Sequence, residues 1–402
     1  MSGPSSRTYA AIALVASSLG LLFASYSTLD YASHLDRRLH DVHCSFIPGA
    51  PPTSEAEACR AAMYSPYSAL LKETYWGGIP ISLFALGAFA FFFGFSVYLL
   101  LAGANAPRKA VAFFGVLGFT PLLASASMFI ISVTQLGQLC KTCVGLYVAS
   151  LLLGIAAGMA LLLLRTREQP PASRSRGWLL AMVWLVALGI TTLAPAAVYA
   201  VAVPDQRPFL GQCGELTSAK PSGTELVVLR GARPVQPAIF FEDPLCPTCK
   251  AFHERLVLEG VFDRLDTELV LFPLDSECNW MLSEPLHPGA CIVSKAVLCA
   301  GDQARSMLEW AYDEQTYLSR AGKSGPDVLR AVIKQRWGES LLKCVDDRKT
   351  EVRLNTHLHF ASENRIPVST PQMYLGKKRV CDEDTDIGLR YTLSQLAPEV
   401  LK

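Results

Sequence analysis

This 402-residue sequence lacks several features that would point directly to a function. Its net charge is only +1, so no excess of one sign favours nucleic acid or another highly charged partner. The H-E-x-x-H, P-loop and G-x-G-x-x-G patterns are absent from the sequence. The usual signals for a zinc protease, a phosphate-binding loop or a dinucleotide site are therefore missing. What remains informative is a set of long apolar segments and twelve cysteines.

Five segments in the first half are apolar and long enough to cross a bilayer, which needs about 20 residues per helix. Their only Asp, Glu, Lys or Arg is Lys141, near the start of the fourth segment. The first segment has a second interpretation as a signal peptide, but its apolar run is too long and no small-x-small cleavage site follows it. An uncleaved helix is therefore expected. The five segments are Tyr9–Leu29, Ile79–Ala102, Val111–Val133, Cys140–Leu164 and Trp178–Val203.

Short basic connectors predict how these segments are oriented. Arg108 and Lys109 lie between the second and third segments, and Arg165 and Arg167 follow the fourth. Cytoplasmic loops are enriched in such residues. We therefore expect these connectors and the N-terminus in the cytoplasm, and everything after Val203 outside.

With this topology every cysteine lies outside the membrane or within a turn of its outer face. An even number of cysteines in an oxidising compartment favours disulfide chemistry. Six structural disulfides would be the simplest account, but the local spacing of four cysteines argues against it. The twelve are Cys44, Cys59, Cys140, Cys143, Cys213, Cys246, Cys249, Cys278, Cys291, Cys299, Cys344 and Cys381.

Two pairs have the C-x-x-C spacing, Cys140/Cys143 and Cys246/Cys249. This spacing serves both zinc binding and dithiol exchange. Zinc needs four ligands, and these two pairs are separated by a transmembrane segment. Around the second pair, a short apolar strand precedes Cys246 and an amphipathic helix follows it, so Cys246 should lie at a helix N-terminus. The helix dipole stabilises a thiolate there, which makes the cysteine reactive at neutral pH.

The second half resembles the thioredoxin-like family, and its DsbA branch in particular, over about Gly223–Lys402. The resemblance rests on the run Phe-Phe-Glu-Asp-Pro-Leu-Cys-Pro-Thr-Cys-Lys that ends at Lys250, and on Ile-Pro-Val-Ser-Thr-Pro ending at Pro371. Strands are expected at Ala238–Glu242, Glu268–Leu274 and Gln372–Leu375, with a helical stretch at Ser276–Ser362 between the last two. The resemblance implies a cis peptide between Thr370 and Pro371, facing the active cysteines.

Two positions depart from this family's pattern. Many relatives carry a buried acid six residues before the first cysteine, where this sequence has Phe240; Glu242 and Asp243 lie nearer the motif. Thr248 stands where strongly oxidising members often have a histidine.

The other pair opens the fourth apolar segment. Three residues along a helix place Cys140 and Cys143 on roughly one face, with Cys143 about 4.5 Å deeper. Such a dithiol can meet a thiol on the water side and an electron acceptor on the lipid side. The alternative is a structural disulfide that fixes the helix end. Cys44 and Cys59 lie in an external connector on the same side.

These four cysteines resemble those of the vitamin K epoxide reductase family, whose bacterial members are fused to a thioredoxin-like domain. The match covers about Tyr9–Leu164. It includes Cys59-x5-Ser65-x-Tyr67-Ser68, a Gly-Ile-Pro entry to the second segment and the first C-x-x-C pair. The resemblance implies that Cys44/Cys59 shuttles electrons and that Cys140/Cys143 lies beside a quinone with Ser65 nearby. The fourteen residues between Cys44 and Cys59 are more than the family usually has.

The expected fold is a membrane helical bundle, a four-helix core plus a fifth transmembrane helix, followed by an α/β thioredoxin-like domain of DsbA type with a helical insertion. The expected boundaries are 1–165 for the core, 166–203 for a linker and the fifth helix, 204–222 for an external linker and 223–402 for the thioredoxin-like domain.

The expected function is a quinone-dependent thiol oxidase in the bacterial inner membrane, with the thioredoxin-like domain in the periplasm. Electrons would pass from reduced secreted clients to Cys246/Cys249, then to Cys44/Cys59, Cys140/Cys143 and a ubiquinone- or menaquinone-type acceptor. The alternatives are a reductive thiol relay, vitamin K epoxide reduction itself, and a non-enzymatic membrane-anchored chaperone or binding module.

The remaining six cysteines allow fifteen pairings, and structural roles are expected for all of them. Cys278 and Cys291 close a short loop that contains His287-Pro288-Gly289, and they are candidates for one disulfide. No metal ligand set is predicted. His253, on the helix after the active pair, is expected to face solvent or pack in the core rather than take part in catalysis.

Overall fold

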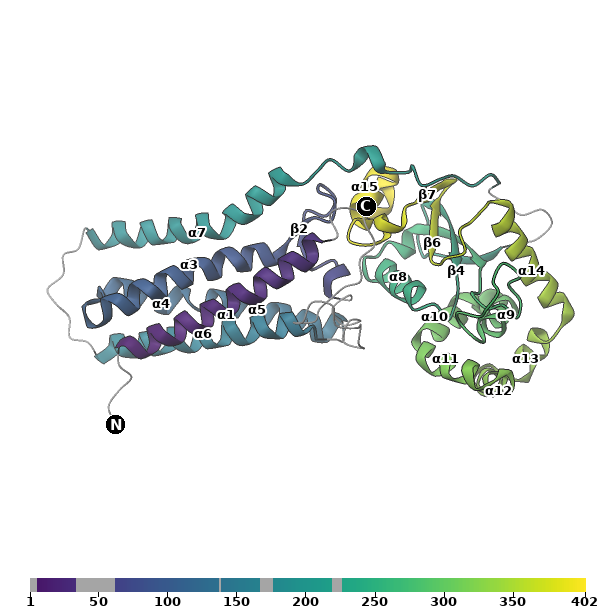
Figure 1. Ribbon diagram of the computed structural model, residues 1–402, viewed down its shortest axis with the longest axis horizontal. Helices are drawn as coiled ribbons and strands as arrows, with labels where there is room; N and C mark the ends of the chain where they lie inside the picture. The colour runs from purple at the N-terminus through teal and green to yellow at the C-terminus, as the bar shows by residue number, and fades with distance from the viewer. Residues whose placement is uncertain (1–5, 34–61, 137–138, 167–175, 219–225) are drawn as a thin grey trace. The chain divides into compact units, whose positions relative to one another are not determined.

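The computed structural model describes residues 6–33, 62–136, 139–166, 176–218 and 226–402. The chain divides into two compact units, Met1–Asp205 and Gln206–Lys402, and Figure 1 shows that the first is helical and the second contains a sheet. The predicted pair Cys44/Cys59 lies outside the described residues.

Within the described part of the first unit, five helical spans are long and apolar enough to cross a membrane. Five were predicted, and the chain is a multi-pass membrane protein. A short antiparallel hairpin, β1 (Ala69–Leu70) with β2 (Ile79–Pro80), precedes the second span. The helices are α1 (Ser6–Ala32), α3 (Ile81–Ala102), α4 (Arg108–Leu117), α5 (Thr120–Ile131), α6 (Lys141–Thr166) and α7 (Arg176–Ala202).

The third span is made of two helices rather than the single one predicted. α4 ends at Leu117 and α5 begins at Thr120, with Pro121 in its first turn. Proline has no N–H to donate and its ring clashes with the carbonyl four residues earlier, which here belongs to Leu117. The helix therefore breaks just before the proline and restarts with it.

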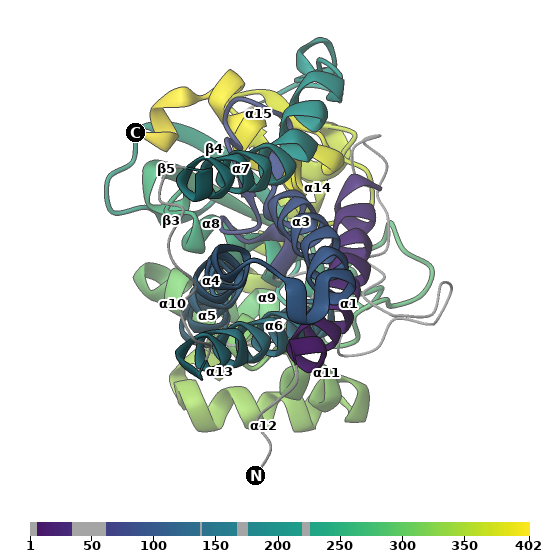
Figure 2. The ribbon, with the colours of Figure 1, turned by 90° about the vertical axis from the view of Figure 1, so that its left-hand side faces the viewer.

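Four spans form the bundle, and the fifth helix, α7, packs against α3. α1 contacts α3 and α6, and α6 also contacts α4 and α5; Figure 2 shows this arrangement end-on. α3 and α7 approach closely at Gly87, where a Cβ atom would lie 2.1 Å from the carbonyl oxygen of Thr191. Small residues permit such close backbone contact between membrane helices.

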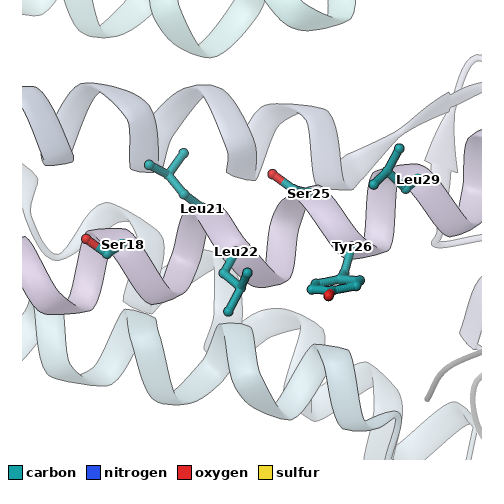
Figure 3. A pocket seen from close by; sticks show the side chains of 6 residues that line it. All are labelled: Ser18, Leu21, Leu22, Ser25, Tyr26 and Leu29. Carbon is teal, nitrogen blue, oxygen red and sulfur yellow. The ribbon is translucent and has the colours of Figure 1, made fainter. Parts of the chain in front are cut away.

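A shallow groove runs along the outer face of α1. Its lining is mostly apolar, and Leu22, Tyr26 and Leu29 are exposed, as Figure 3 shows. In a bilayer this surface meets lipid chains, for which apolar side chains are suited. The six residues that line the groove are Ser18, Leu21, Leu22, Ser25, Tyr26 and Leu29.

The second unit is built on a five-stranded sheet in the order β3-β5-β4-β6-β7. β4 and β5 are parallel, and the other neighbours are antiparallel. The predicted strand Gln372–Leu375 is β6, whereas the other two predicted strands are shifted by two or three residues at one or both ends. The strands are β3 (Val227–Arg230), β4 (Gln236–Glu242), β5 (Leu265–Leu271), β6 (Gln372–Leu375) and β7 (Lys378–Val380).

Both faces of this sheet are buried, each against its own core. Successive side chains of a strand point to opposite faces, so neighbouring residues belong to different cores. Phe240 of β4 belongs to the core that contains α8 (Pro247–Leu258) and α9 (Ala290–Cys299). Its neighbour Phe241 belongs to the opposite core, with Phe360 of α14 (Arg348–Glu363). By the same alternation, Glu242 at the end of β4 lies on the α8 side.

The helical insertion between β5 and β6 is confirmed, but it begins later than predicted. The helix expected from Ser276 starts only at Ala290. Asp275 and Asn279 accept backbone N–H groups in the preceding loop, and such local bonds compete with helix formation. The remaining helices are α10 (Ala304–Asp313), α11 (Gln315–Ser324), α12 (Pro326–Trp337), α13 (Glu339–Val345) and, after the sheet, α15 (Leu389–Leu396).

Candidate active site: two Cys-x-Thr-Cys pairs

Cys246 occupies the N-cap position of α8, as the sequence predicts. Pro247 follows in the first helical turn, where proline's fixed φ suits the helix and its missing N–H costs nothing. The Cys246 Sγ lies 2.8 Å from the hydroxyl of Thr248. Cys249 follows one turn later and is wholly buried, whereas Cys246 retains 4% exposure. Cys246 is therefore the member of the pair that a partner thiol can reach.

The two sulfurs differ strongly in acidity. The hydrogen bond from Cys249, helped by those involving Thr248 and Thr370, lowers the pKa of Cys246 to about 6 against the opposing effect of burial. Burial, together with the neighbouring Cys246 and Glu242, raises the pKa of Cys249 well above its ordinary value. At neutral pH the pair is thus a reactive thiolate beside a protonated thiol.

The Thr370–Pro371 peptide bond is cis. The carbonyl oxygen of Thr370 accepts a 3.1 Å hydrogen bond from the Thr248 hydroxyl and lies 3.6 Å from the Cys246 Sγ. Two segments more than 120 residues apart in the sequence therefore meet at the sulfur.

Glu242 supplies a wholly buried carboxyl group beside the pair. Its Oε2 accepts a 2.9 Å hydrogen bond from the hydroxyl of Tyr312 on α10, and its Oε1 has no hydrogen-bond partner among the described residues. Burial raises the pKa of Glu242 to about 7, although His253 and the Tyr312 hydroxyl act in the opposite direction. An acid with such a pKa can exchange protons near neutral pH.

His253 itself is buried against the rings of Phe262 and Tyr312. This is a packing role, as the sequence suggested.

The helical insertion also contacts the active-site turn through Gln315. Its side-chain amide donates to the carbonyl oxygens of Pro244 and Cys246, at 3.2 and 3.0 Å. Sequence reasoning missed both Gln315 and Tyr312, because neither lies in a motif and each is about 70 residues from its partner.

The other pair begins α6. Cys140 lies just before the helix and Cys143 in its first turn, and both are free thiols. The Thr142 hydroxyl lies 2.9 Å from the Cys140 Sγ, which matches the relation between Thr248 and Cys246. The two pairs therefore share a Cys-x-Thr-Cys arrangement in which a hydroxyl group contacts the first sulfur.

A small polar cluster lies one helical turn beyond Cys143. The hydroxyl of Tyr147 is 3.3 Å from that of Ser132, and the ring of Phe129 packs edge-on against Tyr147. Ser132 begins a π-helical segment, Ser132–Leu136, and such segments often occur at functional sites. Hydroxyl groups beside an aromatic ring can bind a quinone carbonyl and ring.

Ser65, which was predicted to lie near a quinone beside the Cys140/Cys143 pair, is buried in the segment before β1. Its hydroxyl donates to the carbonyl of Ala62, and its carbonyl accepts from the Lys72 ammonium group. These two hydrogen bonds join Ser65 to residues on either side of it in sequence, before and after β1.

Three disulfides join the other described cysteines: Cys213–Cys381, Cys278–Cys291 and Cys299–Cys344. The only cluster of possible metal ligands in the described part of the chain is Cys213, Cys381 and Glu383. Two of its members are joined in a disulfide and cannot act as thiolate ligands.

Residues 11–158 match the family model described as "Vitamin K epoxide reductase family". The chain carries a vitamin K epoxide reductase domain. The matched residues include most of α1, all of α3, the split third span and most of α6, with the Cys140/Cys143 pair. No curated protein matches the sequence.

Solved structures are similar to the unit that follows the vitamin K epoxide reductase domain. Reduced DsbA1 from Neisseria meningitidis is 20% identical, covering 46% of this chain and 96% of its own, with a TM-score of 0.31. DsbA from Xylella fastidiosa is 21% identical, covering 45% and 98%, also at 0.31. The thioredoxin-like fold of this unit is evident from its own sheet order and from the cis-proline opposite Cys246. With two dithiol pairs, the chain is a disulfide oxidoreductase.

Proposed function

We propose that this protein is a quinone-dependent thiol oxidase that makes disulfide bonds in secreted proteins. The observation that carries the proposal is the presence of two free dithiol pairs of the same design. One is acidified at the N-terminus of a helix in a thioredoxin-like unit, and the other is at the end of an apolar helix.

The first step takes place at Cys246/Cys249. A client thiolate attacks the Cys246 sulfur of the oxidised pair, the Cys246–Cys249 bond breaks, and Cys249 takes up the electron pair and a proton. The client's second thiolate then attacks the client sulfur of the mixed disulfide and expels Cys246 as a thiolate. The client leaves with a disulfide bond, and Cys246/Cys249 has gained the client's two electrons.

Further exchanges carry these electrons to Cys44/Cys59 and then to Cys140/Cys143. A membrane quinone of the ubiquinone or menaquinone type is the final acceptor and takes two electrons and two protons. Tyr147 and Ser132 would hydrogen-bond it, and Phe129 would pack on it, one turn from Cys143. The net reaction converts a client dithiol and a quinone into a disulfide and a quinol.

The oxidising direction is favoured by the distribution of thiols and basic residues. Arg108 and Lys109 begin α4, and Arg165 lies in the last turn of α6; basic residues at these helix ends favour a cytoplasmic location for them. Both free pairs then lie at or beyond the outer face of a bacterial inner membrane, with the thioredoxin-like unit in the periplasm. A reductive relay would need a thiol near the cytoplasmic face to accept electrons, and the sequence has none there.

The test is quinone reduction by the full chain in detergent, supplied with a reduced unfolded client and followed by quinone absorbance. We expect turnover that Cys246→Ser and Cys143→Ser both abolish. The Cys299→Ser/Cys344→Ser variant is the matched control, because it removes two cysteines outside the relay and should retain turnover. Turnover that survives Cys246→Ser would mean that clients reduce the membrane pair directly. Absence of turnover in the parent, with all thiols intact, would overturn the oxidase proposal.

A further inference from the structure

A half-buried histidine lies against the turn that carries Cys246. The Nδ1 atom of His287 is 2.7 Å from Oδ2 of Asp243, although 44 residues separate them in the sequence. The Asp243 side chain is wholly buried, and that of His287 is 21% exposed. Asp243 comes three residues before Cys246, whose backbone N–H donates to the Asp243 carbonyl at 3.0 Å.

The Asp243 carboxylate is fixed in place by the backbone. Its Oδ1 accepts a 2.7 Å hydrogen bond from the N–H of Leu245, and its Oδ2 accepts one of 2.8 Å from the N–H of Leu274. Both oxygens therefore accept backbone N–H groups, which fixes the orientation of the carboxyl group. A buried polar group of this kind needs partners, and the His287 imidazole is one of them.

His287 is held as firmly as its partner. Its backbone N–H donates to the carbonyl of Leu274 at 2.9 Å. Two residues later, the N–H of Gly289 donates to the buried carboxylate of Asp275 at 2.8 Å. The Cys278–Cys291 disulfide closes the same loop. These contacts hold the loop that carries His287 against Asp243.

No other positive charge is available within the motif itself. Pro247 and Thr248 separate the two cysteines, and Lys250 is paired with Glu254, with 3.7 Å between charged atoms. A positive charge that adds to the hydrogen bonds on Cys246 would therefore come from another segment, and His287 is the titratable base joined to this turn.

We propose that His287, held by Asp243, is a positioning residue that supplies the positive charge stabilising the Cys246 thiolate. The proposal deepens the proposed function, since it assigns the control of thiol acidity at the same site. A stabilised Cys246 thiolate is a better leaving group when the client's second thiolate attacks the mixed disulfide. The electron pair of the broken sulfur–sulfur bond then remains on Cys246, whose charge interacts with that of His287.

The charges around this pair set the pH range in which it acts. Burial lowers the pKa of His287, but the hydrogen bond and charge of Asp243, with the charges of Cys246 and Asp275, outweigh it and leave the pKa raised. Cys246 also interacts with Cys249 and Glu242. Since the pKa of Cys246 is about 6, thiolate and imidazolium coexist from about pH 6 up to the raised pKa of His287.

The experiment measures the acidity of Cys246 in the full chain in detergent. In a Cys249→Ser background, short iodoacetamide pulses from pH 5 to pH 9 label Cys246. Mass spectrometry of the tryptic peptide that ends at Lys250 then gives the fraction alkylated. His287→Asn keeps a donor for Asp243 but removes the charge, and His287→Lys restores a charge. His359→Asn, at an exposed histidine whose ring is tilted against that of Trp280, is the control.

We expect His287→Asn to move the midpoint of alkylation upward by about one pH unit, which corresponds to about fivefold slower labelling at pH 6. His287→Lys should restore the parent rate, and His359→Asn should leave it unchanged. An unshifted midpoint in His287→Asn, with the Cys278–Cys291 disulfide intact, would overturn the inference and leave the oxidase proposal standing. If His287→Asn fails to form that disulfide, a raised midpoint in a folded His287→Lys would overturn the inference instead. An ordinary thiol midpoint in the parent would remove the basis of both proposals.

Discussion

The hydroxyl of Tyr312 donates a 2.9 Å hydrogen bond to the buried carboxyl group of Glu242. This bond connects the helical insertion to the end of β4, directly beside the proposed reactive pair. The family resemblance places a buried acid six residues before the first cysteine, where this chain has Phe240. Glu242 supplies an acid four residues before it instead, on the same face of the strand.

Glu242→Gln should slow the step in which Cys249 must lose its proton. With a pKa of about 7, Glu242 is ionised above that pH and can accept the proton; below it, the carboxyl is protonated and cannot. The groups that face it are Tyr312, His253 and the two cysteines. In the parent, we expect the rate at which Cys249 resolves a Cys246–glutathione mixed disulfide to increase as the pH rises through about 7. In Glu242→Gln it should be at least about tenfold slower at pH 8.

Tyr312→Phe is the matched comparison for this measurement. It removes a hydrogen bond that favours the carboxylate, so the pH profile should move upward without losing its amplitude. Equal rates for Glu242→Gln and the parent across pH 6 to 9 would exclude Glu242 as the base.

Thr248→Val should make Cys246 less acidic. The hydroxyl lies 2.8 Å from the sulfur and is among the groups that lower the pKa of Cys246. Valine keeps the shape but lacks the hydroxyl, which can turn its one proton from the Thr370 carbonyl to the Cys246 thiolate, so labelling of Cys246 at pH 6 should fall roughly two- to fivefold. Thr248→Ser should recover the parent rate. If valine and serine behave alike, the hydroxyl has no part in thiol acidity.

Gly87→Ala should loosen α7 from the bundle. A Cβ at this position would lie 2.1 Å from the carbonyl oxygen of Thr191, and backbone cannot give way as a flexible side chain can. We expect a cost of about 2 kcal/mol, seen as faster hydrogen exchange in α7 and a lower thermal midpoint in detergent. Gly94→Ala is the control, since nothing lies within 4 Å of its added methyl group. Equal behaviour of the two variants would contradict the close α3–α7 approach.

Removal of the three disulfides, one at a time, should destabilise the second unit in order of loop length. The sequence separations are 13 for Cys278–Cys291, 45 for Cys299–Cys344 and 168 for Cys213–Cys381. Loop-closure entropy gives about 3, about 4 and about 5 kcal/mol respectively. Hydrogen exchange of β4 and β5 peptides in the full chain measures these losses, because core amides exchange through global unfolding. A different order would show that the loss of stability comes mainly from changes in native packing rather than from the greater freedom of the unfolded chain.

The parts of the fold predicted from sequence are those that local patterns encode. Apolar length alone identified the five spans, and a short apolar strand followed by an amphipathic helix after Cys246 identified the β4–α8 unit. The start of the helical insertion was wrong, because side chains such as Asp275 stabilise a loop that helix periodicity does not register. The break in the third span was also missed, although Pro121 marked it.

Much of the candidate site arises from contacts between distant segments, which spacing cannot reveal. Asp243 and His287 were both visible in the sequence, yet nothing in their positions indicated that the fold would join them. Gln315 and Tyr312 lie in ordinary amphipathic helices. Their roles depend on the way the insertion folds back onto the end of β4.

The three disulfides of the second unit have a consequence for how the protein is made. A newly synthesised copy leaves the ribosome with these six cysteines reduced, and the loop that holds His287 contains one of the pairs. Under the proposed function, such a copy is itself a client and is matured by copies already at work. The capacity to form disulfides is then passed from existing copies of the protein to new ones.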